Sequence, residues 1–177
     1  GSNVMAELAI ERWEQPASFA RTDELPFEDH PKAYSSKFDV EGIKKFGDIL
    51  RTGEEVIVTE KIHGANARYL FENGTFFMGS RSQWLKPDVK HPWAVAADND
   101  QRIREWCEAH PGSVLYGEVY GAVQSLRYGL GRGEDSFAAF AVLTAGVWQD
   151  TGNLLADDTI PTVPLLYRGP FDAKIFE

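Results

Sequence analysis

The sequence predicts an α+β domain in which a mostly antiparallel sheet carries a few packed helices. Three observations predict this class. Runs rich in β-branched and aromatic residues alternate with glycine-containing turns along much of the chain. Two segments, 38–50 and 98–110, carry apolar residues at helical spacing. The length of 177 residues suits one hydrophobic core of ordinary size.

The chain is expected to begin with an extended lead-in over residues 1–38. Pro16, Pro26 and Pro31 and mixed charges leave this stretch without a sustained periodicity, and its first residues, GS, are typical of a cloning scar. We therefore expect one folded domain over residues 39–177.

The domain is expected to open with a helix and a strand. The segment FDVEGIKKFGDIL predicts an amphipathic helix with Asp39 as its N-cap and with Val40 and Ile43 on the apolar side. After the connection at Gly53, the run EVIVTEK predicts a buried strand.

The remaining elements alternate strands, turns and a second helix. Asn73-Gly74 lies between two aromatic-rich runs, which predicts a tight β-hairpin. In the helix expected over 98–110, Ile103, Trp106 and Cys107 share one stripe, and Pro111-Gly112 ends it. The runs SVLYGEVYG, SFAAFAVL and PTVPLLYRG predict three further strands.

Composition and charge exclude several classes of protein. The net charge of −9 argues against bulk electrostatic binding of nucleic acid, so any such contact must be local. Cys107 is the only cysteine, which excludes an intrachain disulfide or a thiolate metal cluster. No apolar run reaches the roughly 18 residues that a membrane span needs. We expect a cytoplasmic protein with no membrane contact.

The stretch EKIHGANAR, residues 60–68, is the strongest chemical signal. Lys61 follows an apolar strand and precedes a glycine turn, so its amine is expected at the mouth of a sheet-lined cleft. A lysine in a partly desolvated pocket with cationic neighbours releases its proton more readily, and the neutral amine is a nucleophile. The segment KKFG, 44–47, also matches K-x-x-G, but helical spacing puts Lys44 on a polar face. Of these two lysines, only Lys61 is expected to take part in a reaction.

The residues after Lys61 suit contacts with a nucleotide. Gly64 would let the backbone approach a phosphate without a Cβ in the way. His63 and Asn66 could donate hydrogen bonds to phosphates or to a ribose. The alternative for this pair is a structural role in capping the turn.

Several segments together resemble the covalent nucleotidyltransferase superfamily of DNA ligases, RNA ligases and mRNA capping enzymes. TEKIHGANAR resembles motif I, and its form E-K-I-H-G-x-N is similar to the RNA ligase 2-like branch. MGSRSQWL resembles motif Ia, LYGEVYG motif III and FAAFAV motif IIIa, in family order. VPLLYRGPFD resembles the stretch that precedes motif IV.

The resemblance implies a fold and a reaction. It implies an antiparallel-sheet, ATP-grasp-like ligase adenylation domain that uses ATP and Mg²⁺ or Mn²⁺. Lys61 would attack the α-phosphate and form a lysyl-AMP phosphoramidate. AMP would pass to an RNA 5′-phosphate, and a 3′-OH would then displace it, with nicked duplex as one substrate form. The catalytic residue is Lys61, and the metal ligands stay unknown.

The resemblance also implies roles for other residues, each with a structural alternative. Glu60 would lie near the adenine, or be a solvated charge; Arg81 would pair with phosphate, or lie on the surface. Glu118 would bind a ribose hydroxyl or hydrated metal, or form a structural salt bridge. Phe140 would stack on adenine. The nucleotide-binding set is Glu60, Ile62, His63, Gly64, Asn66, Arg81, Glu118 and Phe140. Lys86, Lys90, His91 and Trp93 form a basic, aromatic segment that would either meet nucleic acid or be a solvated loop.

The sequence departs from the family in two ways. Ala141 stands where close relatives have an aspartate. The chain also ends at Glu177, before motifs IV and V, so we expect a domain incomplete at its C-terminus. The stretch IERWEQPA resembles a join to an upstream OB-fold domain. Two rival functions stay open: a truncated or degenerate module that binds nucleotide or RNA without catalysis, and a DNA ligase or capping-type nucleotidyltransferase.

Overall fold

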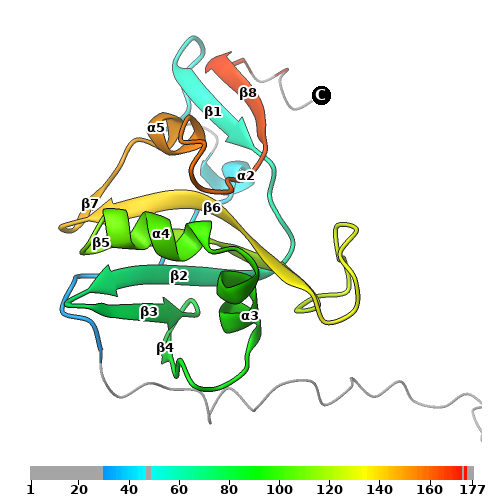
Figure 1. Ribbon diagram of the computed structural model, residues 1–177. Helices are drawn as coiled ribbons and strands as arrows, with labels where there is room; N and C mark the ends of the chain where they lie inside the picture. Colours follow the sequence, from blue (N-terminus) through cyan, green and yellow to red (C-terminus); the bar gives the residue numbers. More distant parts are fainter. Residues whose placement is uncertain (1–29, 47–48, 173, 175–177) are drawn as a thin grey trace, which may run out of the picture.

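The fold is built on two antiparallel sheets and four short helices in the part of the chain that the structure describes (Figure 1). The computed structural model describes residues 30–46, 49–172 and 174. The larger sheet has six strands in the order β4-β3-β2-β5-β6-β7. Their bounds are β2 Ala65–Glu72, β3 Thr75–Gly79, β4 Trp84–Leu85, β5 Ser113–Gly121, β6 Asp135–Thr144 and β7 Val147–Trp148. The predicted α+β class is confirmed.

The hairpin between β2 and β3 forms at Asn73-Gly74, as predicted. Asn73 has φ 51° and Gly74 φ 80°, so both central residues are left-handed, as a two-residue turn that follows the strand twist requires. The register runs from Glu72 opposite Thr75 to Arg68 opposite Gly79. This turn therefore fixes which residues of β2 face each side of the sheet.

Helices α3 (Pro92–Asn99) and α4 (Arg102–Ala109) pack against one face of the larger sheet. Ile103, Trp106 and Cys107 of α4 are buried, which confirms the predicted stripe. The predicted helix over 98–110 was too long at its start. α3 was missed, and it begins where the Nδ1 atom of buried His91 accepts the Ala94 N–H at 3.0 Å.

The opposite face of the larger sheet is covered in part by residues 30–38. The Tyr116 hydroxyl donates to the Ser36 carbonyl at 2.8 Å, and the Arg68 guanidinium donates to the Ser35 hydroxyl at 3.1 Å. Phe38 packs against the buried cluster that contains Tyr116. This part of the expected lead-in contacts the domain. The segment IERWEQPA lies outside the described residues.

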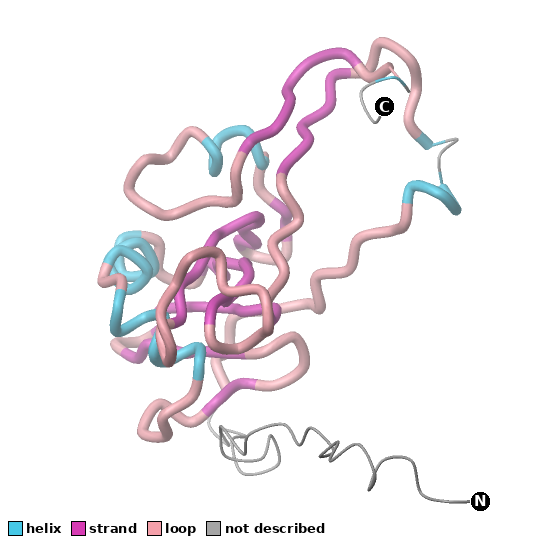
Figure 2. Tube along the Cα trace, turned by 90° about the vertical axis from the view of Figure 1, so that its right-hand side faces the viewer, coloured by secondary structure: helices cyan, strands magenta, loops and turns pink. Residues whose placement is uncertain are grey.

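Strands β1 (Glu55–Thr59) and β8 (Leu165–Pro170) form a two-stranded sheet that stands apart from the larger one (Figures 1 and 2). β1 was predicted to be buried, but its residues are exposed or half-buried because only β8 pairs with it. β8 begins at Leu165, later than the predicted start at residue 161.

The helix predicted over 38–50 is largely replaced by extended chain. Only α2 (Ile43–Phe46) is helical, and residues 47–48 lie outside the described residues. Val40 is 76% exposed and Ile43 43% exposed, so the apolar positions found no core to pack on. Asp39 is not an N-cap; its carboxylate accepts a hydrogen bond from Arg81.

A β-bulge interrupts the pairing of β5 with β6. Tyr116 pairs with Ala141 and Gly117 with Ala139, so Phe140 is an extra residue on β6. The Ala139 N–H donates to the Pro161 carbonyl at 2.8 Å, and the Val163 N–H donates to the Ala139 carbonyl at 2.9 Å. Through these two hydrogen bonds, the bulge holds residues 161–163, which lead to β8, against β6.

The short helix α5 (Thr151–Leu155) follows β7 and is capped by the carboxylate of Asp150, which accepts the Asn153 N–H at 3.0 Å. Among the described residues, none of the helices combines the length and apolar character that crossing a membrane requires.

Candidate functional site

A cleft of about 970 Å³ opens between the larger sheet, β1 and the chain that precedes β1. Its size lies near the upper end of the usual range for small-molecule sites, about 300–1,000 Å³. Seven of the nine predicted site residues line it: Glu60, Lys61, Ile62, Asn66, Arg81, Glu118 and Phe140. Residues up to 80 positions apart therefore meet at one place.

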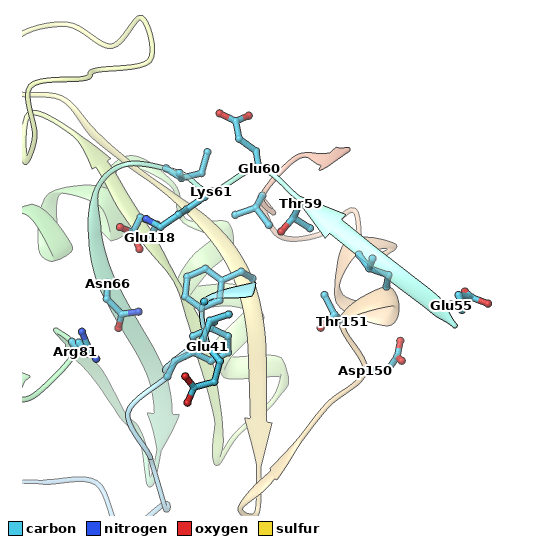
Figure 3. A pocket seen from close by; sticks show the side chains of 17 residues that line it. Glu41, Glu55, Thr59, Glu60, Lys61, Asn66, Arg81, Glu118, Asp150 and Thr151 are labelled. Atoms are coloured by element: carbon cyan, nitrogen blue, oxygen red, sulfur yellow. The ribbon is translucent and has the colours of Figure 1, made fainter. Parts of the chain in front are cut away.

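Lys61 lies just beyond the end of β1, in the connection to β2, and its side chain is exposed. Figure 3 shows the side chain pointing across the cleft toward Glu118. Ile62, the next residue, is 7% exposed and packs with Ala138 and Val163. The anchored isoleucine and the exposed lysine place the amine at the cleft mouth.

Asn66 and Glu118 form a directly opposed pair on β2 and β5, and both side chains line the cleft. The backbone carbonyl of Asn66 accepts a hydrogen bond from Trp93 Nε1 at 3.0 Å. Asn66 Oδ1 is buried and has no hydrogen-bond partner among the described residues. A buried acceptor without a donor is costly, so this atom suits a donor supplied by a ligand.

Burial raises the pKa of the Glu118 carboxyl above its usual range. Three groups oppose that shift by favouring the charged form: the Lys61 ammonium, the Gly64 N–H and His63. The Gly64 N–H donates to Glu118 Oε1 at 3.2 Å. Glu118 is thus a half-buried carboxyl group beside the lysine, and burial and its local partners act on its pKa in opposite directions.

Phe140 owes its position to the bulge, since strict alternation along β6 would not place it beside Ala141 on the cleft side. Its ring contacts that of Phe38, with centroids 4.7 Å apart and planes tilted by 43°. Ala141 is 7% exposed and lies in the apolar cluster with Leu70 and Tyr116. An aspartate at that position would be buried among apolar groups.

Arg81 reaches the rim of the cleft from the turn after β3 and pairs there with Asp39. Both side chains are more than half exposed. Phe38 and Asp39, adjacent in the chain, therefore contact the two residues that were predicted to hold the base and a phosphate.

His63 and Gly64 are the two predicted site residues that the cleft lining does not include. His63 is exposed, and its N–H donates to the Tyr128 hydroxyl at 2.7 Å. A Cβ on Gly64 would lie 2.1 Å from the Val119 carbonyl oxygen. Close packing on β5 therefore requires glycine here, which is a different reason from the predicted approach to a phosphate.

Sequence reasoning missed several lining residues and assigned a wrong environment to others. Phe38, Val40, Glu41 and Gly42 line the cleft although the segment was expected to be lead-in and helix. His91 and Trp93 were weighed as nucleic-acid contacts or loop residues. His91 is buried and caps α3, so it is neither a nucleic-acid contact nor a solvated loop residue, and the half-buried Trp93 donates to the Asn66 carbonyl of β2. The sequence signal that could have predicted α3 is Pro92, because proline is common at the first position of a helix.

The charge of the lining limits what it can bind unaided. Two basic side chains, Lys61 and Arg81, face five acidic ones: Glu41, Glu55, Glu60, Glu118 and Asp150. A polyphosphate would need added cations there. Within the described residues, no group of three or more His, Cys, Asp or Glu side chains is placed to hold a metal ion.

Comparison with known proteins agrees with this fold. Three solved structures of Naegleria gruberi RNA ligase are similar: one with pyrophosphate, and two single-residue variants, with ATP and Mn and with AMP and Mn. Their TM-scores are 0.70, 0.69 and 0.70, each at 18% sequence identity, and each match covers 97% of this chain. The chain spans about half of their length, 53% to 54%.

No match was found among curated protein sequences. The sequence profile described as RNA ligase matches residues 54–177, which is more than half of the chain. This match begins just before β1 and includes every predicted site residue. The chain belongs to the RNA ligase family.

Proposed function

We propose that this chain carries out the adenylation chemistry of an ATP-dependent RNA ligase. The observation that supports it most is the convergence of Lys61, Asn66, Arg81, Glu118 and Phe140 on one cleft. In the proposed step, the Lys61 ammonium first releases a proton to water, and the lone pair of the neutral Nζ then attacks the α-phosphorus of ATP. The bond from this phosphorus to the bridging oxygen breaks, pyrophosphate leaves with the bonding electron pair, and the attacking nitrogen releases a second proton to water. The product is a lysyl-AMP phosphoramidate.

The remaining residues are proposed to bind and orient the nucleotide. Phe140 stacks on the adenine, and Glu60 lies near it. Asn66 and Glu118 face the ribose and α-phosphate, and Asn66 Oδ1, which has no partner among the described residues, accepts a hydrogen bond from a ribose hydroxyl. Arg81 and His63 pair with phosphate oxygens at the rim. Ile62 holds the lysine connection in place through its buried side chain.

A divalent cation, Mg²⁺ or Mn²⁺, is proposed to accompany ATP and to offset charge on its phosphates. The acidic lining supports this need, since two basic side chains cannot balance both five carboxylates and a triphosphate. The similar Naegleria ligase structures contain ATP, AMP, pyrophosphate or Mn. Because the described residues supply no preformed set of ligands, the nucleotide is the main candidate ligand for the ion.

The full reaction is proposed to seal RNA ends. AMP moves from Lys61 to an RNA 5′-phosphate, and the 3′-OH of a second end, at a nick or a free terminus, displaces it. Family membership supports RNA as the substrate. An upstream OB-fold domain in a longer parent protein would help to hold that RNA. The net charge of −9 supports this proposal, because binding to an RNA backbone needs clustered basic residues.

The experiment is the intact mass of the chain after incubation with ATP and Mg²⁺ or Mn²⁺, with and without added pyrophosphate. We expect a gain of one AMP that pyrophosphate reverses. Lys61→Ala should abolish the gain, and Lys44→Ala, at the other K-x-x-G match, should retain it. A gain that persists in Lys61→Ala would contradict the assignment of the nucleophile.

No gain at saturating ATP would contradict adenylation by this chain. Isothermal titration calorimetry with ATP then separates the remaining readings. ATP binding that Lys61→Ala leaves intact would indicate a nucleotide-binding module without catalysis. A gain of GMP from GTP, in place of AMP, would favour a capping-type nucleotidyltransferase.

A further inference from the structure

The position of Lys61 depends on a short connection that lacks strand pairing of its own. β1 ends at Thr59 and β2 begins at Ala65, so Lys61 belongs to neither ladder. Its side chain is exposed, and the residues beside it must therefore hold the amine in place. Reacting atoms must be held near 3–3.5 Å for an efficient displacement, and small misplacements are costly to rate.

The connection is held on its β1 side by the sheet and by apolar packing. The Glu60 N–H donates to the Pro164 carbonyl at 2.9 Å, and Ile62 is buried against Ala138 and Val163. These contacts fix the chain up to Ile62. The next two residues must be fixed by other parts of the molecule.

The long loop between β5 and β6, residues 122–134, supplies contacts on the β2 side in addition to the hydrogen bond from the Gly64 N–H to Glu118. The His63 N–H donates to the Tyr128 hydroxyl at 2.7 Å, and Gln124 Nε2 donates to the Gly64 carbonyl at 3.2 Å. The loop is itself tied at its ends, because the Ala122 N–H donates to the Glu134 carbonyl at 2.9 Å. The loop thus holds the connection between β1 and β2 at His63 and Gly64, shortly after Lys61.

Tyr128 adopts a backbone conformation that tyrosine disfavours. Its φ is 52°, in the left-handed region, where a bulky residue is strained by roughly 1–3 kcal/mol. Glycine would adopt this conformation without strain, and Gly129 follows it directly. The Tyr128 ring packs edge-on against Tyr120, with centroids 5.2 Å apart. The strained backbone and the packed ring together aim the hydroxyl at His63.

We propose that Tyr128 is a positioning residue for Lys61, and that its hydroxyl acts by holding the His63 N–H. The inference rests on the proposed function, because a positioned nucleophile matters only if Lys61 reacts. Tyr128 does not line the cleft in which the nucleotide is proposed to bind. By holding the backbone at His63, Tyr128 restricts the orientations that the Lys61 side chain can adopt while ATP is bound.

The test compares Tyr128→Phe with Tyr120→Phe in the full chain. Tyr128→Phe keeps the packed ring and removes only the oxygen that accepts the His63 N–H. Tyr120→Phe removes a hydroxyl from the neighbouring ring and leaves the hydrogen bond intact. Formation of the AMP adduct is followed by quenched-flow mass spectrometry over a range of ATP concentrations. Exchange of the His63 amide with deuterium is followed by NMR.

We expect Tyr128→Phe to lower the adenylation rate at saturating ATP by about tenfold, with little change in half-saturating ATP concentration or Tm. The His63 amide should exchange faster in this variant. Tyr120→Phe should behave as wild type in both measurements. This split between rate and binding is what a merely structural role would not produce.

Three results would overturn the inference, and they are distinguishable from failure of the proposed function. An unchanged rate in Tyr128→Phe, in a wild-type chain that does form the adduct, overturns only the positioning role. Unchanged exchange of the His63 amide overturns the contact itself, whatever the activity. A wild-type chain that forms no adduct overturns the proposed function and the positioning role with it.

Discussion

The two sides of the cleft differ in how firmly they are held. The sheet side, formed by β2, β5 and β6, presents Asn66, Glu118 and Phe140 from paired strands whose core residues are buried. The rim, defined here as residues 38–42, presents Val40 at 76% exposed and an ion pair of Asp39 with Arg81 at the surface. The sheet side is therefore preformed, whereas the rim after Phe38 is held by contacts that contribute little to stability.

This difference indicates which side of the cleft would move when a ligand binds. Asn66 and Glu118 are opposed across a ladder and cannot separate without breaking it. Asp39 can leave Arg81 at small cost because this ion pair is exposed, whereas the half-buried Phe38 ring also lies against Tyr116 and Trp148. Binding of a nucleotide is expected to displace the rim and to leave the sheet side unchanged.

The largest effect is expected from deleting core volume behind the sheet side. Leu115 on β5 is fully buried, so Leu115→Ala should lower the free energy of unfolding by about 2–5 kcal/mol. Val40→Ala, on the rim, should change it by less than about 0.5 kcal/mol. Urea denaturation of both variants measures the contrast. Equal losses would show that the rim is packed as firmly as the sheet.

A smaller loss is expected from adding volume to the sheet side. A Cβ on Gly117 would lie 2.2 Å from the Phe137 ring and 2.4 Å from the Ala138 carbonyl oxygen, so Gly117→Ala should cost about 1–3 kcal/mol. Gly42 on the rim has no atom within 4 Å of its added Cβ. Gly42→Ala should be neutral or stabilise by up to about 1 kcal/mol. An unchanged free energy of unfolding in Gly117→Ala would contradict the close packing of β5 against β6 at the bulge.

A pH-dependent effect is expected at Glu118. Burial raises the pKa of this carboxyl in the folded state, so the folded chain binds its proton more readily than the unfolded chain does. The charged form therefore destabilises the fold above the folded-state pKa, and this effect fades as the pH falls toward the unfolded value.

Glu118→Gln, which keeps the oxygen that accepts the Gly64 N–H, should therefore have a higher Tm than wild type at neutral pH. The two Tm values should converge near pH 4, by differential scanning calorimetry. A gap that widens with acid would show that the charged carboxylate stabilises the fold.

The smallest effect is expected from freeing Arg81 at the rim. An exposed ion pair contributes at most about 1 kcal/mol, so Asp39→Asn should leave the Tm nearly unchanged. If Arg81 binds phosphate as proposed, ATP affinity should rise by about fivefold or less. Asp88→Asn, an exposed carboxylate outside the cleft lining, is the matched control. Calorimetric titration in low and high salt would measure both, and a loss of affinity would assign Asp39 to the nucleotide site.

The parts of the site that could be predicted from the sequence are those with a distinctive local sequence context. Glu118 and Lys61 were found because a carboxylate among aromatic residues and a lysine before a glycine turn are chemically unusual in their local contexts. The helix over 38–50 was predicted wrongly because periodicity reports a face that could pack, and the fold provides no partner for it. The role of Gly64 was likewise hidden, since the Val119 carbonyl that excludes a Cβ comes from another strand.

The sequence by itself determined the α+β class, the hairpin at Asn73-Gly74, the buried stripe of α4 and the identity of seven of the residues that line the cleft. These depend on local chemistry: turn residues that accept a positive φ, and the spacing of apolar side chains. Only the tertiary structure decided the bulge that presents Phe140, the packing of Phe38 on it, and the hold of Tyr128 on His63. Each joins segments far apart in the chain, and such contacts exist only once the sheet has set the distances between them.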